Sequence, residues 1–144
     1  MKICSYLLCF VLVFYSCQSI KTSTLFLENG ISKELAVYRK SQVLNISYDL
    51  SFEIPKEKEH PILSQLTLKA NLGNVQEPLY LDFNEKKENL KSVIVNGKTV
   101  VILHEKEHLI IPKKYLIKGQ NIVEVYFIAG DLSLNRNDDF LYTL

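Results

Sequence analysis

The sequence predicts an all-β domain: an antiparallel sandwich or saddle-like sheet of about seven strands, preceded by one short helix. Two observations carry this prediction. Apolar and polar residues alternate without a break through residues 45–54, which is the period-2 pattern of a strand. Further apolar runs of strand length follow, and turn residues such as Asn96-Gly97 separate them.

Length and charge narrow the class of protein. The chain has 144 residues, enough for one domain with a sizeable core. It carries 17 Lys and Arg residues against 16 Asp and Glu residues, so it has no strong field to attract nucleic acid or an anionic membrane surface. The Phe and Tyr residues are not interleaved with basic clusters. We therefore expect no nucleic-acid partner.

Residues 1–16 have the pattern of a signal peptide. Lys2 supplies a positive start, residues 7–14 form an apolar stretch, and Ser16 is a small residue directly before Cys17. The apolar stretch is shorter than the roughly 20 residues that a helix needs to span a bilayer. This segment is therefore interpreted as a targeting signal and excluded from the fold.

The four residues Phe14-Tyr15-Ser16-Cys17 resemble the lipobox of bacterial lipoproteins, in which the cysteine is acylated and becomes the mature N-terminus. The resemblance implies an exported, membrane-anchored protein, in the periplasm or at the cell surface, with lipid on Cys17. Phe14 departs from the usual residue at its place, and an ordinary cleaved signal peptide is the alternative. The other two cysteines are Cys4 and Cys9, so the chain beyond Cys17 has no thiol for a disulfide, a zinc site or a nucleophile.

Residues 17–30 are expected to be the lipidated cysteine and a tether, and residues 31–144 the folded domain. The domain opens with a short helix over residues 33–41, because Ser32 is a good N-cap and Arg39 and Lys40 suit the C-terminal end of the helix dipole. Leu35 and Tyr38, with Val37 as a further candidate, form its apolar side, which predicts a packing helix.

The strand over residues 45–54 is the clearest element in the pattern. One face is expected to be buried and the other wet; the expected buried side chains are Ile46, Tyr48, Leu50, Phe52 and Ile54. Later strands are predicted over residues 66–72, 79–83, 90–95, 98–103, 109–111 and 121–129. Asn96-Gly97 predicts a type I′ turn, since both of its central residues need positive φ. Lys118-Gly119 marks the turn before the last strand.

After Gly130 the strand pattern stops, and residues 131–139 are expected to form a polar, irregular loop. Its oxygen-rich side chains invite comparison with a calcium site, but they lack the spacing and closing glutamate of an EF-hand, so a solvated loop is the favoured interpretation; they are Asp131, Asn135, Asn137, Asp138 and Asp139. Phe140-Leu141-Tyr142 looks like the start of another apolar segment, which suggests that further chain belongs after it.

One stretch, His104-Glu105-Lys106-Glu107-His108, matches the H-E-x-x-H pattern of zinc peptidases. That motif works on a helix, where residues four apart share a face. Here β-branched runs flank it, and on an extended strand the two histidines would lie about 13 Å apart. A hairpin could bring them across from each other but would still supply too few ligands for a catalytic zinc. The match is interpreted as the polar tip of a hairpin, so we expect no metal site and no catalytic residue.

Several segments, in order, carry a resemblance to a known family: Glu34-Leu35-Ala36-Val37-Tyr38-Arg39-Lys40-Ser41-Gln42, the strand after it, Val93-Ile94-Val95-Asn96-Gly97-Lys98, Ile110-Ile111-Pro112 and Asp138-Asp139-Phe140-Leu141-Tyr142-Thr143. They resemble the N-terminal β-domain of aminopeptidase N-like zinc metallopeptidases of the exported bacterial type, and the resemblance spans residues 30–144. It includes no catalytic motif of the family. The family's own H-E-x-x-H, its downstream glutamate and its G-x-M-E-N motif would lie beyond Leu144.

The resemblance implies a non-catalytic domain or fragment of a membrane-anchored enzyme that releases N-terminal residues from peptides. The partner would be the missing catalytic domain, in cis or as a separate chain, and zinc would belong to the complete enzyme. This chain alone is expected to hold no cofactor and to be inactive. The alternative is a free-standing, lipid-anchored β-sandwich that binds a protein or glycan at the cell surface. An unpaired edge and an apolar patch would favour the first interpretation, and polar, blunted edges the second.

Overall fold

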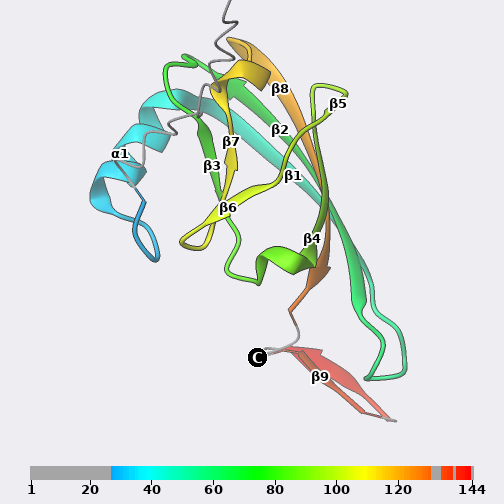
Figure 1. The fold of residues 1–144 in the computed structure, drawn as a ribbon. Helices are drawn as coiled ribbons and strands as arrows, with labels where there is room; N and C mark the ends of the chain where they lie inside the picture. The colour runs from blue at the N-terminus through cyan, green and yellow to red at the C-terminus, as the bar shows by residue number, and fades with distance from the viewer. Residues whose placement is uncertain (1–26, 131–133, 138, 144) are drawn as a thin grey trace, which may run out of the picture.

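The computed structural model describes residues 27–130, 134–137 and 139–143, and the predicted signal peptide and Cys17 lie outside them. The all-β prediction is confirmed: antiparallel strands in sheets of five and three dominate, with one short α-helix (Figure 1). Among these residues, no helix has the length and hydrophobicity of a transmembrane segment.

The helix α1 (Lys33–Gln42) begins where the sequence predicts. The Ser32 hydroxyl accepts a hydrogen bond from the Leu35 N–H at 3.0 Å and so satisfies a backbone donor of the first turn. Leu35 is fully buried, whereas Val37 is exposed. At Val43 the chain passes directly into the first strand.

The larger sheet has the strand order β1-β2-β8-β4-β5, and every neighbouring pair is antiparallel. Its strands are β1 (Val43–Glu53), β2 (Ile62–Leu72), β8 (Gly119–Ala129), β4 (Leu90–Val95) and β5 (Lys98–Thr99). Asn96 and Gly97 join β4 to β5 with φ angles of 50° and 77°, which confirms the predicted turn with positive φ at both positions. β1 is an edge strand.

The smaller sheet has the order β3-β7-β6, with β3 (Leu79–Asp82), β7 (His108–Ile111) and β6 (Leu103–Glu105). The prediction of a single strand over residues 98–103 is wrong. The chain pairs with the larger sheet only at β5 and with the smaller sheet from Leu103, because it crosses from one sheet to the other between them. Two short 3-10 helices, Lys87–Asn89 and Lys113–Tyr115, stand in the connections.

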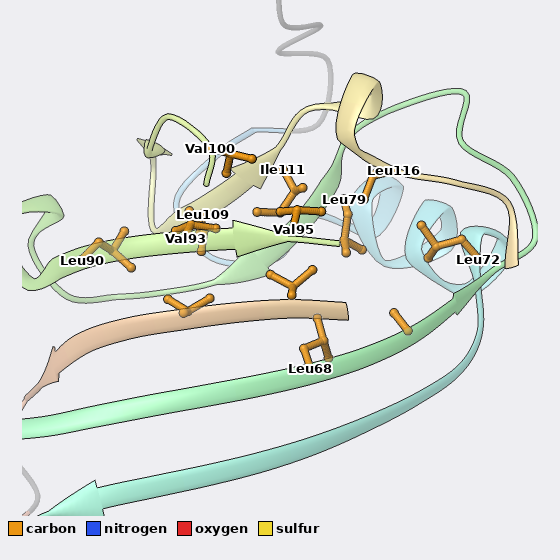
Figure 2. Packing of buried hydrophobic residues seen from close by; sticks show 13 residues of the cluster. Leu68, Leu72, Leu79, Leu90, Val93, Val95, Val100, Leu109, Ile111 and Leu116 are labelled. Atoms are coloured by element: carbon orange, nitrogen blue, oxygen red, sulfur yellow. The ribbon is translucent and has the colours of Figure 1, made fainter. Parts of the chain in front are cut away.

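The main core lies between the two sheets. Its fully buried side chains come from β2, β8 and β4 on one side and from β3 and β7 on the other, as Figure 2 shows for Leu68, Val93 and Val95 against Leu79, Leu109 and Ile111. A second, smaller cluster fills the space between α1 and the smaller sheet, and consists of Leu27, Leu35, Tyr80 and Ile110. The layers are therefore helix, smaller sheet and larger sheet (Figure 1).

The C-terminal part departs from the prediction of an irregular loop. β9 (Leu134–Arg136) and β10 (Leu141–Thr143) pair as an antiparallel hairpin. The Asn137 side chain accepts from the Phe140 N–H at 2.9 Å, which supports the turn between them. The polar composition of this segment predicts a loop. The two strands have only three residues each, which is too few to show a clear alternation of apolar and polar side chains.

Candidate functional site

The most unusual surface is a row of apolar side chains along β1, which we call the β1 stripe: Ile46, Tyr48, Leu50 and Phe52. Their exposed fractions are 38%, 58%, 50% and 50%. Directly opposite them on β2 are Ala70, Leu68, Leu66 and Ser64, and paired residues in an antiparallel ladder point to the same face. The β1 stripe is thus a continuation of the face that forms the main core.

The stripe is bare because the smaller sheet does not extend over it. All of the fully buried members of the main core come from other segments, and the cluster drawn in Figure 2 has no stick on β1. Of the β1 side chains, only Val43, at the start of the strand, packs against the main core. Among the described residues, neither core cluster includes a side chain of the stripe between Ile46 and Phe52.

The prediction that this face of β1 is buried is therefore wrong, for Ile54 (42% exposed) as well as for the stripe. Alternation correctly indicated which side chains share a face. It could not indicate that the covering layer ends at the neighbouring strand, because the width of a sheet and of its cover are set by long-range pairing.

A groove of about 390 Å³ opens where the β1 stripe approaches α1 and β3. Apolar side chains from three strands line it, together with three charged ones from α1 and β3; the lining residues include Ile46, Tyr48, Leu66, Tyr80, Arg39, Lys40 and Asp82. The groove is thus mostly apolar with a few charged groups. This composition suits an inserted side chain of a partner.

Arg39 and Asp82 form a bidentate pair that joins α1 to β3, with N–O distances of 2.9 and 2.6 Å. Asp82 also accepts from Nδ1 of the buried His108 at 3.0 Å. Partial burial raises the pKa of the Asp82 carboxyl, but the hydrogen bonds and positive charges of Arg39 and His108 outweigh it, so the net pKa lies below the ordinary value. Elsewhere on α1, burial raises the pKa of the Tyr38 hydroxyl.

His108 Nε2 is buried and has no hydrogen-bond partner in the described part of the chain. An aspartate that orients a histidine is also an arrangement found in catalytic sites. Here, however, the ring is 1% exposed, and the histidine serves to pair β7 with Asp82 across the smaller sheet. The arrangement therefore positions α1 against the sheet and leaves the imidazole no access to a substrate.

The H-E-x-x-H match falls in the β6–β7 hairpin, as expected. Glu105 pairs with His108 and His104 with Leu109, so the two histidines are on opposite faces of the smaller sheet. His104 faces the main core, where its Nε2 lies 2.8 Å from the Phe83 carbonyl oxygen. His108 faces α1. The two rings are not brought together to share one metal.

The other residues of this motif also have structural contacts. Lys106 and Glu107 form the turn with φ angles of 46° and 67°, an uncommon conformation for residues other than glycine, asparagine or aspartate. Lys106 Nζ donates to the Leu27 carbonyl at 2.9 Å, and Glu107 accepts from the Gly30 N–H at 3.0 Å. The turn thereby fixes the segment that leads into α1.

Metal ligands do not converge elsewhere in residues 27–130, 134–137 and 139–143, where no group of three or more His, Cys, Asp or Glu residues could hold an ion. Asp131 and Asp138, two of the oxygen-rich residues compared above with a calcium site, lie outside the described residues, as does the predicted lipid site Cys17. Asn135, Asn137 and Asp139 belong to the C-terminal hairpin.

Sequence reasoning gave Arg136 no role, yet it is a buried anchor. Its guanidinium donates to the carbonyl oxygens of Pro55, Glu57, Lys58 and His60 at 2.8–3.4 Å. It thereby ties the C-terminal hairpin to the loop between β1 and β2. A lone arginine in a polar stretch gives no local signal for contacts made across about 80 residues.

The comparisons with known proteins do not identify the chain. No family model, curated protein or solved structure matches it.

Proposed function

We propose that this chain is a non-catalytic docking domain whose β1 stripe is covered by a further domain. The observation that carries the proposal is the bare stripe itself. Four adjacent apolar side chains continue the core face beyond its cover, and an extended apolar patch of this kind on a sheet face is typical of an interaction surface. The patch ends in a groove with charged side chains, as many docking surfaces do.

The resemblance of the sequence suggests the identity of that domain. We propose the catalytic domain of an aminopeptidase N-like zinc metallopeptidase, joined in cis or held as a separate chain. Zinc and the residues that activate water would belong to that domain. Export and lipid attachment at Cys17 are part of the same proposal, and they would place the enzyme at a membrane surface.

The uncovered face favours this proposal over a free-standing binding module. A module that works alone would be expected to protect its edge strand with polar or charged side chains. Among the described residues, β1 instead presents an apolar row and an edge that pairs with no strand. Neither the H-E-x-x-H match nor the His108 arrangement offers a site for chemistry in this chain.

The direct test is to read the DNA downstream of the Leu144 codon in all three forward frames. The proposal expects a coding sequence with a helical H-E-x-x-H and a downstream glutamate, in the same frame or as an adjacent gene. A clean stop followed by unrelated genes, with no such peptidase encoded nearby, would contradict it.

A further inference from the structure

The outer edge of β1, on the side away from β2, carries no strand in the part of the chain that the structure describes. In the described part of the chain β1 pairs only with β2, and the register between Asn45 and Glu53 runs without interruption. Natural edges are usually guarded by proline, by charged side chains and lysine above all, by a bulge or by a covering segment. Residues 45–53 contain no proline or lysine, and the one register shift lies before them, between Val43 and Asn45.

The two faces of this edge differ in chemistry. On the core side lies the β1 stripe, and on the other side the exposed side chains are polar: Asn45, Ser47, Asp49, Ser51 and Glu53. Asp49 and Glu53 are the only charges on residues 45–53, and both are acidic. Asp49 is exposed, and among the described residues it forms no ion pair.

A second copy of the chain fits this edge poorly. Asp49 is the midpoint of residues 45–53, so pairing two copies over the whole regular strand sets Asp49 directly opposite itself. Like charges directly opposite destabilise a strand pair. Registers shifted by two residues avoid this contact but leave residues at an end of the regular strand unpaired. A strand with a cation at this position fits better.

We propose that the free edge of β1 takes up a β-strand of the partner protein that alternates apolar and polar residues and places a Lys or Arg opposite Asp49. Its apolar side chains would extend the β1 stripe, and its polar face would extend that of the larger sheet. The inference rests on the proposed docking function, since it specifies how the partner engages the same strand.

The test uses two synthetic, dye-labelled peptides of about nine residues, the length of a typical long strand. Both alternate Val and Thr; one has Lys at its central polar position and the other has Glu. Binding to the full chain is followed by fluorescence anisotropy. The Lys peptide is expected to bind the wild type about fivefold more tightly than the Glu peptide, because an attraction replaces a repulsion.

Asp49→Lys should reverse that preference. Glu88→Lys makes the same charge change at an exposed position outside β1 and should leave the preference unchanged. Circular dichroism confirms that each variant is folded. The inference would be overturned if neither peptide bound, or if wild type and Asp49→Lys showed the same preference between the two peptides. A stable dimer of the wild type that neither peptide dissociates would also overturn it.

Hydrogen exchange separates this inference from the proposed function. Bound Lys peptide should slow exchange of alternate amides in residues 45–53, those that point away from β2. A partner domain that buries Leu50 without protecting these amides would leave the docking function standing and contradict strand addition.

Discussion

Tyr48 and Leu68 lie directly opposite each other on β1 and β2, on the same face of one sheet, yet Leu68 is fully buried and Tyr48 is 58% exposed. The boundary between core and surface thus runs between two hydrogen-bonded strands. An apolar side chain left half in water gains only part of its burial free energy, and covering it would supply the remainder. This boundary underlies the docking proposal.

The first prediction compares two leucines on this face. Leu68→Ala should lower the free energy of unfolding by roughly 2–5 kcal/mol, because it leaves a cavity in the core. Leu50→Ala removes the same atoms from a half-exposed position and should cost less than about 1 kcal/mol. Urea denaturation of both variants measures the difference. Equal losses would mean that the stripe is covered within the chain itself.

The second prediction concerns Arg136. Arg136→Ala removes the donors that four loop carbonyls share and should cost roughly 1–3 kcal/mol. Proteolysis in the loop between β1 and β2 should become faster. Arg136→Lys restores the charge but not the planar fork, so it should recover only part of the stability. Lys114→Ala, an exposed position elsewhere, is the control. An unchanged cleavage rate in Arg136→Ala would contradict the anchoring role.

The third prediction is a pH dependence. The folded pKa of Asp82 lies below its ordinary value of 3.8, so the unfolded state takes up the proton first as pH falls. The contribution of Asp82 is therefore complete above that ordinary value and is lost as pH drops through the lower, folded pKa. Stability should be measured from about pH 6 to pH 2 for wild type and Asp82→Asn. The gap between them should narrow toward acid; a constant gap would refute the assignment.

The fourth prediction concerns zinc. Because His104 and His108 are on opposite faces of the smaller sheet, added Zn²⁺ should give no saturable rise in melting temperature. If the chain had one zinc site and the free Zn²⁺ concentration were 100 times its dissociation constant, binding would stabilise the fold by about 2.7 kcal/mol, which is easily detected. His104→Ala and His108→Ala serve as comparisons. A zinc-dependent rise in melting temperature that each substitution alone abolishes would show a shared metal site and contradict the hairpin interpretation.

Local signals predicted the local features well. Ser32 caps α1, Asn96-Gly97 forms its turn with positive φ, and the apolar alternation of β1 correctly groups its side chains by face. Each of these depends on a few consecutive residues. The turn at Lys106-Glu107 is harder to predict from the sequence, because neither residue favours positive φ. The contacts that stabilise this turn are with the distant residues Leu27 and Gly30.

Features that depend on distant pairing were missed. The exposure of Tyr48 follows from where the smaller sheet ends, and the burial of Arg136 follows from a loop about 80 residues earlier in the chain. The strand predicted over residues 98–103 is divided because the chain changes sheets there. None of these follows from the period of hydrophobicity.

The most direct test of the docking function is photo-crosslinking at Leu50 and Ser51. These neighbours lie on opposite faces of β1, so each can carry the photoreactive residue benzoylphenylalanine as a control for the other. The full chain is irradiated in the cells that produce it, and the adducts are identified by mass spectrometry. The account predicts that position 50 crosslinks to a peptide from a domain with an H-E-x-x-H motif, either within the same polypeptide or in a separate one, and that position 51 does so far less. Equal capture at both positions, or none at position 50, would contradict it.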